Sequence, residues 1–441
     1  MLLQVAKMCS QYSYNQTSIW EIPEEWEAVE LDDLIEVETG KRAKGGGLSE
    51  GTIPSIGGEH IDRSGNVIWN DNLKFIPEDF YDGLTQGKVG LNDVLIVKDG
   101  ATTGKVALVN KLPYPKVAVN EHVFIIRSKS SKLLNEFLFY VMFSSIGQRQ
   151  IKLNFHGMIG GIKRGELKSF KIPLPPLPEQ KSIAFVLSTI QTAKEKTEQV
   201  IKATKELKKS MMKHLFTYGP VSLEEAEKVK LKETEVGMIP KEWEVVRLGD
   251  VAKISSGGSA PQGRKYFNGD KPFIRVKHID NESFTIKGFD LINNEAVKKY
   301  KLKLFPKGTI VFPKSGASVY LEKRALLPLD SFIVSHLCAV NVNNNVLQEF
   351  VFYFLIDKKL AERKAEGYPT LNLSEVKQVK IPLPPLPTQQ KIASILSVID
   401  EKIQAEENKK KALEDLFKSM LHNLMTGRIR VKDLNFGVEN V

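Results

Sequence analysis

Two long stretches of the sequence repeat apolar residues at helical spacing. From Ile183 to Leu215, and again from Ile392 to Leu424, seam positions recur at alternating steps of three and four residues, with polar residues in the middle of each seam. This spacing is typical of a helix that pairs with another helix. We expect two long helices, the first over residues 180–215, that pair antiparallel and carry two globular domains at opposite ends of a helical strut.

Outside these helices the pattern changes to short β-branched and aromatic runs separated by Gly, Asn and Asp clusters. Such runs indicate strands joined by turns. Residues 133–143 and 347–360 have helical spacing instead. The pattern therefore predicts an α+β fold. The expected strands are 93–97, 117–127, 309–313 and 331–342.

The chain contains an internal repeat. The sequence KIPLPPLP stands at residues 171–178 and again at 380–387. Similarly, IPEEWE at 22–27 matches IPKEWE at 239–244 in all but one residue. Each copy has a divergent domain followed by a similar segment that holds the long helix. Two copies of this length predict a pseudo-twofold molecule with two α/β domains in tandem.

The repeated proline segment sets the boundaries of the expected domains. Its prolines disfavour helix and central strand, so we expect a stiff extended joint, with Pro178 and Pro387 in the first turn of each helix. The predicted organisation is an N-terminal tail (1–21), a first domain (22–170), a joint and helix (171–219), a linker (220–238), a second domain (239–379), a second joint and helix (380–427) and a C-terminal tail (428–441).

Composition and charge narrow the possible functions. Lys and Arg number 63 against 53 Asp and Glu, a net charge of +10, which favours a polyanionic partner but also fits a lysine-rich solvated surface. No apolar run approaches the roughly 18 residues of a membrane span, so we expect a cytoplasmic protein without a membrane partner. The two cysteines, Cys9 and Cys338, are too few for a cysteine-based zinc site or a disulfide framework.

Three features together resemble the specificity subunit of type I restriction and modification enzymes: the segment LKETEVGMIPKEWEVVRLGD at 231–250, the doubled PLPPLP followed by Gln180 and Gln389, and the two-repeat layout. The resemblance implies two target-recognition domains, each reading one half of a split asymmetric site in double-stranded DNA. It also implies helices that set the gap and bind two methylase subunits, with restriction subunits joining through the complex. S-adenosylmethionine, ATP and magnesium would belong to those partners, and this chain would hold no cofactor. Glu179 is replaced by Thr388 in the second copy, which we take as a detail of partner contact.

The repeat also sorts candidate DNA contacts. Positions shared by both copies cannot distinguish two half-sites, so they suit phosphate contacts, whereas divergent basic loops suit base contacts. The shared candidates are Lys98 and Lys314; the turn candidates are Thr102, Thr103, Lys105 and the counterpart Ser318. The divergent candidates are Lys41, Arg42, Lys44, Arg264, Lys265 and Tyr266, with Arg275 and Lys277 in an expected strand as weaker ones.

Catalytic motifs are weak or missing. Gly100–Val106 resembles a phosphate-binding loop, but it has one residue too few between its glycines and Val in place of Ser or Thr, and the counterpart at 316–320 has no lysine. No Asn-Pro-Pro-aromatic methylase motif occurs, and His60 and His278, which recur in both copies, suit a structural role better than a metal. We therefore expect a non-catalytic DNA reader; the alternatives are a stand-alone nuclease or methylase and a purely structural coiled-coil scaffold.

Overall fold

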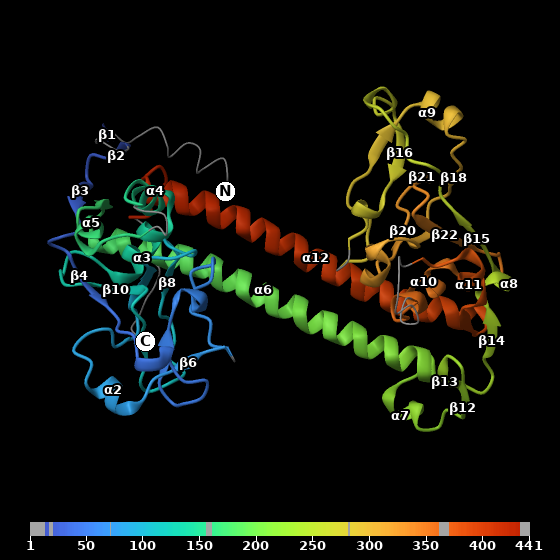
Figure 1. Ribbon diagram of the computed structural model, residues 1–441, viewed down its shortest axis with the longest axis horizontal. Coiled ribbons are helices and arrows are strands. Elements are labelled where there is room, and N and C mark those ends of the chain that lie inside the picture. The colour runs from blue at the N-terminus through green and yellow to red at the C-terminus, as the bar shows by residue number, and fades with distance from the viewer. Residues whose placement is uncertain are drawn as a thin grey trace. The chain divides into compact units, whose positions relative to one another are not determined.

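The chain folds as two compact units whose boundaries lie inside the long helices. The computed structural model describes residues 14–16, 21–70, 72–155, 161–280, 283–360 and 370–432, with side chains at all of these except 14–16 and 44. The first unit comprises Met1–Thr197 and Asn408–Val441, and the second comprises Glu198–Glu407. Helices α6 (Leu177–Tyr218) and α12 (Leu386–Met425) each begin in one unit and end in the other (Figure 1).

Short strands and short helices make up the rest of the first unit. Its elements are β1 (Tyr14–Gln16), β2 (Glu21–Pro23), β3 (Glu27–Glu30), β4 (Ile35–Thr39), η1 (Lys44–Gly46), β5 (Pro54–Ile56), η2 (Gly58–His60), β6 (Lys74–Phe75), α2 (Glu78–Asp82), β7 (Val94–Val97), β8 (Val106–Leu108), β9 (Ala118–Val119), β10 (Val123–Ser128), α3 (Asn135–Phe143), α4 (Ser145–Leu153), α5 (Arg164–Lys168) and β11 (Lys171–Leu174).

The second unit repeats most of these elements in the same order. They are α7 (Leu223–Ala226), β12 (Leu231–Thr234), β13 (Gly237–Pro240), β14 (Glu244–Arg247), α8 (Leu248–Val251), β15 (Ala252–Ser256), η3 (Arg264–Tyr266), β16 (Lys271–Ile274), η4 (Val276–His278), β17 (Asp290–Ile292), α9 (Asn294–Lys299), β18 (Leu304–Phe305), β19 (Ile310–Pro313), η5 (Ala317–Leu321), β20 (Ala325–Leu326), β21 (Ser331–Ile333), β22 (Leu337–Val342), α10 (Gln348–Ile356), α11 (Leu373–Gln378) and β23 (Lys380–Leu383).

Each unit is built around an antiparallel four-stranded sheet, ordered β4-β10-β7-β8 in the first unit and β15-β22-β19-β20 in the second. Both faces of its inner strands are buried, which explains the continuous apolar run of β7. Val94 and Ile96 lie in a core with α3, whereas Leu95 and Val97 face a core with the second sheet, β6-β5-β9. The second unit repeats this layering, with β17-β16-β21-β18 as its second sheet. The predicted α+β fold in tandem repeat is confirmed.

The proline joints form strands before they form helices. Residues 171–174 pair with β3, and residues 380–383 pair with β14, each in a two-stranded antiparallel sheet. The expectation of an extended segment is correct, but the segment is hydrogen-bonded as an edge strand, where a proline without an N–H is tolerated. The helices then begin at Leu177 and Leu386, so Pro178 and Pro387 lie in their first turns, as predicted.

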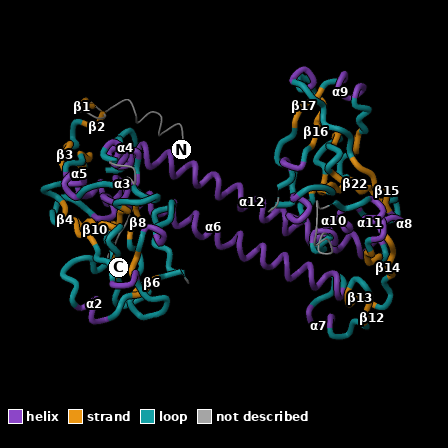
Figure 2. The backbone as a smooth tube through the Cα atoms, in the orientation of Figure 1, coloured by secondary structure: helices purple, strands orange, loops and turns teal. Residues whose placement is uncertain are grey.

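The long helices are continuous over 42 and 40 residues (Figure 2). Each lacks Gly and Pro after its first turn, and α6 stops at Gly219-Pro220, a typical helix end. Within the second unit, Lys205 bonds Glu407 and Lys208 bonds Asp400, so the two helix segments run antiparallel. Towards the helix ends the buried positions are Met212 and Leu421 instead of the predicted Met211 and Met420. The seam shifts by one residue because 3.6 residues per turn do not match a seven-residue repeat.

Segments expected as linker and tails contain ordered structure. The linker at 220–238 holds α7, β12 and the first half of β13, and β1 of the expected N-terminal tail pairs with β2. The tail expected from residue 428 begins with a packed segment, in which Val431 is 3% exposed. The packing of Val431 depends on residues far away in the chain, whereas β1 and β2, and likewise β12 and β13, pair with near neighbours.

Candidate nucleic-acid interface

A lysine and a histidine meet at the ends of two central strands in the first unit. Lys98 follows β7 and His122 precedes β10, and these strands are antiparallel neighbours, with Val97 opposite Val123. This register lets the Lys98 backbone N–H donate to the His122 carbonyl at 2.9 Å. The carboxylate of Asp99 joins them: it lies 2.5 Å from the Lys98 ammonium and also contacts the His122 imidazole.

Asp99 offsets the charge of this lysine. Burial raises the pKa of the Asp99 carboxyl, but hydrogen bonds from Lys98 and His122 outweigh burial and hold that pKa below its ordinary value. The carboxylate is therefore charged at neutral pH. Lys98 remains a candidate phosphate contact, but a phosphate would have to compete with Asp99 for its ammonium.

The second unit builds the same arrangement without the acid. Lys314 follows β19 and His336 precedes β22, and the Lys314 N–H donates to the His336 carbonyl at 2.8 Å. Ser315 stands where the first unit has Asp99, and its hydroxyl lies 2.7 Å from His336 Nδ1. The second unit therefore offers the same shared lysine without an adjoining negative charge from that position.

The two histidines were not singled out from the sequence. His122 has a side chain that is 51% exposed, and His336 is also exposed. Each directly precedes a buried strand and follows its lysine by 24 or 22 residues. That near-constant spacing was the available signal, but only the pairing of the strands shows that lysine and histidine are neighbours.

A hollow of about 200 Å³ lies beside His122 in the first unit. It is lined by Lys41 and Arg42 from the divergent loop and by Glu121 and His122. Arg42 Nε lies 3.6 Å from Glu121 Oε1, yet the Arg42 side chain remains 72% exposed. The fold thus brings two predicted base contacts next to the shared strand ends; the side chain of Lys44 lies outside the described part of the structure.

The turn at 100–105 is held by its own polar groups. The Thr103 hydroxyl donates to the Gly100 carbonyl at 2.7 Å. The Lys105 ammonium donates to the carbonyls of Ile61 at 2.6 Å and Gly58 at 3.3 Å. The predicted DNA contact at Lys105 is therefore corrected: this lysine fastens the 58–61 loop to the turn. The same bonds explain why the turn resembles a phosphate-binding loop without presenting its lysine to a ligand.

The second unit has an equivalent lysine that the repeat comparison missed. Lys323 donates to the Ile279 carbonyl at 3.0 Å, as Lys105 does to Ile61. It follows Gly316 by seven residues instead of five, because the 3-10 helix η5 lengthens the turn. Residues 316–320 have no lysine, but Lys323 beyond them makes the equivalent contact. Thr102 and Ser318, the other turn candidates, are both partly buried.

Of the three adjacent candidates in η3, only two are on the surface. Tyr266 is 1% exposed and its ring packs edge-on against Tyr300, with ring centroids 5.5 Å apart. Its predicted role as a base contact is corrected, because this ring is part of the core. Lys265 is exposed and lies 3.4 Å from Glu295. Arg264 is exposed and remains the strongest base-contact prediction of this loop.

Arg275 and Lys277 gather around one acid. Both residues follow the end of β16. The prediction that they lie in a strand is therefore wrong. Arg275 Nε is 2.5 Å and Lys277 Nζ is 3.5 Å from the Asp290 carboxylate. Burial raises the pKa of Asp290, but the hydrogen bond from Arg275 and the nearby positive charges together outweigh burial and lower that pKa. The Arg275 guanidinium also lies 5.3 Å from the Phe267 ring centroid, so this residue is engaged within the unit.

The recurring histidines His60 and His278 stabilise the backbone. Nδ1 of His60 accepts a hydrogen bond from the Gly57 N–H at 2.9 Å, and Nδ1 of His278 accepts one from the Arg275 N–H at 3.0 Å. Identical bonds in both units explain why the residue recurs. Within the described residues, no group of three or more His, Cys, Asp or Glu is placed to hold a metal ion. None of the described helices is long and apolar enough to cross a membrane.

Each long helix also exposes a leucine outside its seam. Leu207 on α6 is 53% exposed and Leu416 on α12 is 46% exposed. They occupy the same position of the two repeats, 209 residues apart. The repeat therefore places an exposed leucine at the same point of both helices.

Comparison with known proteins identifies the family. M. jannaschii has a similar protein, the "Type I restriction enzyme MjaIX specificity subunit", 27% identical over 98% of this chain and 100% of the relative. The "Type I restriction enzyme EcoDI specificity subunit" of Escherichia coli is 22% identical over 85% of this chain and 81% of the relative. The crystal structure of the type I restriction-modification system S subunit from M. genitalium shares the fold with a TM-score of 0.63 at 18% identity, covering 93% of this chain and 98% of that one. The family model described as "Type I restriction modification DNA specificity domain" matches twice, at residues 23–206 and 240–415, and the chain therefore belongs to this family.

Proposed function

We propose that this chain is the DNA-reading subunit of a type I restriction-modification complex. Each unit reads one half of a split, asymmetric site in double-stranded DNA. The observation that supports this most directly is the repeated strand-end arrangement of Lys98 with His122 and Lys314 with His336. A polar arrangement built twice, with divergent basic loops elsewhere in each unit, is what a reader of two different half-sites requires.

In this proposal, residues shared by the two units contact phosphates, and residues that differ between them contact bases. Lys314 and His336 position the DNA backbone in the second unit. Lys98 and His122 are their equivalents in the first unit, where Asp99 competes with the phosphate for the lysine. Arg42 and Arg264 are exposed, differ between the units and read base edges, since a guanidinium bonds guanine bidentately.

Partner subunits carry the chemistry in this proposal. Two methylase subunits dock on the helices at the surfaces around Leu207 and Leu416, and restriction subunits join through the assembled complex. S-adenosylmethionine, ATP and magnesium are bound by those partners, and this chain is non-catalytic. Support comes from the names of its relatives as specificity subunits and from a solved structure, with a TM-score of 0.51 at 19% identity, whose title concerns complex assembly of the type I system.

Methylation mapping tests this function. A host genome sequenced with and without this gene should show one gene-dependent, bipartite, asymmetric methylated motif. The Arg264→Ala variant should change only one half of that motif. The purified chain, given DNA, magnesium and S-adenosylmethionine without partners, should methylate and cleave nothing; either activity would refute the assignment.

A further inference from the structure

The segment that follows α12 is folded back onto the first unit. Gly427 ends the helix with a φ of +68°, and the Ile429 N–H then donates to the Asn423 carbonyl at 3.2 Å. The Arg430 side chain that follows is only 2% exposed. A side chain that is always charged is rarely buried unless it is paired.

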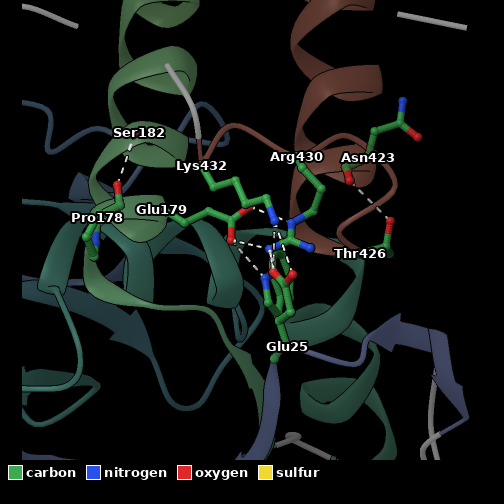
Figure 3. A network of polar contacts seen from close by, with 9 residues as sticks. Glu25, Pro178, Glu179, Ser182, Asn423, Thr426, Arg430 and Lys432 are labelled. Atoms are coloured by element: carbon green, nitrogen blue, oxygen red, sulfur yellow. Dashed lines mark hydrogen bonds and ion pairs between the residues drawn. The ribbon is translucent and has the colours of Figure 1, made fainter. Parts of the chain in front are cut away.

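Its partner is a carboxylate from the beginning of α6 (Figure 3). Arg430 Nε lies 2.7 Å from Glu179 Oε1, and Arg430 Nη2 lies 2.8 Å from Glu179 Oε2, so the contact is bidentate. Glu179 is also 2% exposed at its side chain, and it accepts a further bond from Trp26 Nε1 at 3.0 Å. Arg430 Nη2 donates to Glu25 at 2.7 Å as well. Glu179, taken from sequence as a detail of partner contact, instead binds the chain's own C-terminal segment.

Protonation supports a fully charged pair. Burial opposes the charge on Arg430, but hydrogen bonds to Glu179 and Glu25 outweigh this and raise the pKa of the guanidinium above its ordinary value. The same guanidinium, through its hydrogen bond, lowers the pKa of the Glu25 carboxyl.

The segment after α6 resembles the segment after α12 but lacks the buried ion pair. Helix α6 also ends at a glycine of positive φ, Gly219, which lies against Trp243 as Gly427 lies against Trp26. The residue three positions after that glycine is Ser222, and the residue that matches Glu179 is Thr388. Neither of these residues is ionisable. The buried ion pair therefore belongs to the first unit alone.

We propose that Glu179 and Arg430 form a matching contact that makes the first unit accept the segment after α12 and reject the equivalent segment after α6. The two segments differ in whether they bring a positive charge to Glu179. A matched pair satisfies both charges, whereas the segment with Ser222 would leave the Glu179 carboxylate buried without its arginine, and an unpaired buried charge is strongly destabilising. Pairing of the first repeat with the second repeat is thereby favoured over pairing of two first repeats from different chains.

Four full-length chains test the matching rule: the natural chain, Glu179→Thr, Arg430→Ser, and the double variant that carries the residue pair of the second repeat. Hydrogen exchange of the amides at residues 427–432 is the measurement, with the amides of β22 in the second unit as internal reference. Each single variant should speed exchange of the segment at least tenfold. The double variant should recover most of that loss, because neither charge is then left buried alone.

Lys432→Ser is the matched control. It lies in the same segment, but its ion pair is with the exposed carboxylate of Glu25, so it should change exchange by less than about threefold, as surface pairs contribute little. Exchange that rises additively in the double variant would overturn the proposal. If the single variants unfold the first unit, the double variant decides: a folded, protected segment supports matching, and an unfolded one overturns it.

Discussion

Asp99 separates the DNA-contact chemistry of the two units and is the residue to perturb first. In the Asp99→Ser variant, the Lys98 ammonium loses the carboxylate that lies 2.5 Å away and becomes available to a phosphate. The reciprocal change, Ser315→Asp, places an acid next to Lys314. The two substitutions exchange the residues of equivalent positions, so they should have opposite effects on DNA affinity.

The size of the effect follows from counterion release. One additional phosphate contact should make the slope of log affinity against log salt steeper by about 0.9, which corresponds to about 3.5-fold in affinity between about 50 and 200 mM salt. The slope should become steeper by about 0.9 in Asp99→Ser and shallower by about 0.9 in Ser315→Asp. The same reasoning predicts that Lys314→Ala flattens the slope by about 0.9, whereas Lys98→Ala changes it little, because Lys98 is already paired.

Fluorescence anisotropy with a labelled duplex that lacks the recognition site measures these slopes over a salt series. The Asp99→Ser, Lys98→Ala double variant is the control, and it should return the slope to that of the natural chain. An unchanged slope for Asp99→Ser would refute the role of Asp99 as a countercharge. Equal losses for Lys98→Ala and Lys314→Ala would refute the difference between the two units.

Three further predictions concern other parts of the molecule. Lys105→Met should destabilise the first unit by about 1.5–3 kcal/mol in denaturant unfolding, the usual contribution of a hydrogen bond to a charged group, while the salt slope of DNA binding stays unchanged. Leu207→Glu and Leu416→Glu should each remove one methylase subunit from the complex in native mass spectrometry, and the double variant should remove both; retention of both would place docking elsewhere. Asp280 has a pKa below its ordinary value of 3.8, because bonds from Lys287 and Ser283 outweigh the opposing effect of burial. Its contribution to stability is therefore present above about pH 4 and lost as the pH falls below that value, and Asp280→Asn should lessen the acid sensitivity of unfolding.

The internal repeat made much of the fold predictable from one sequence. The spacing of apolar residues located both long helices, since a helix that buries one face must repeat its apolar positions every three or four residues. Pro178 and Pro387 located the first turn of each helix, because a residue in that turn does not need the N–H that proline lacks. The same comparison of copies marked Lys98 with Lys314, and His60 with His278, as positions with a common role.

What the sequence could not decide was which distant residues become partners. Tyr266 stood in a basic, glycine-flanked loop, yet tertiary packing placed its ring in the core. Lys323 was overlooked because a two-residue insertion moved it, although its ammonium reaches the same carbonyl position as that of Lys105. His122 and His336 gained significance only when strand register set them beside their lysines.

The contact between Glu179 and Arg430 shows this limit most clearly. Sequence alone determined that Glu179 has no ionisable counterpart at Thr388, but 251 residues separate the glutamate from its arginine. Local spacing determines helices because their backbone hydrogen bonds join residues four positions apart in the chain. A buried ion pair forms only where folding removes water from both charges at one place, and that place was decided by the tertiary structure.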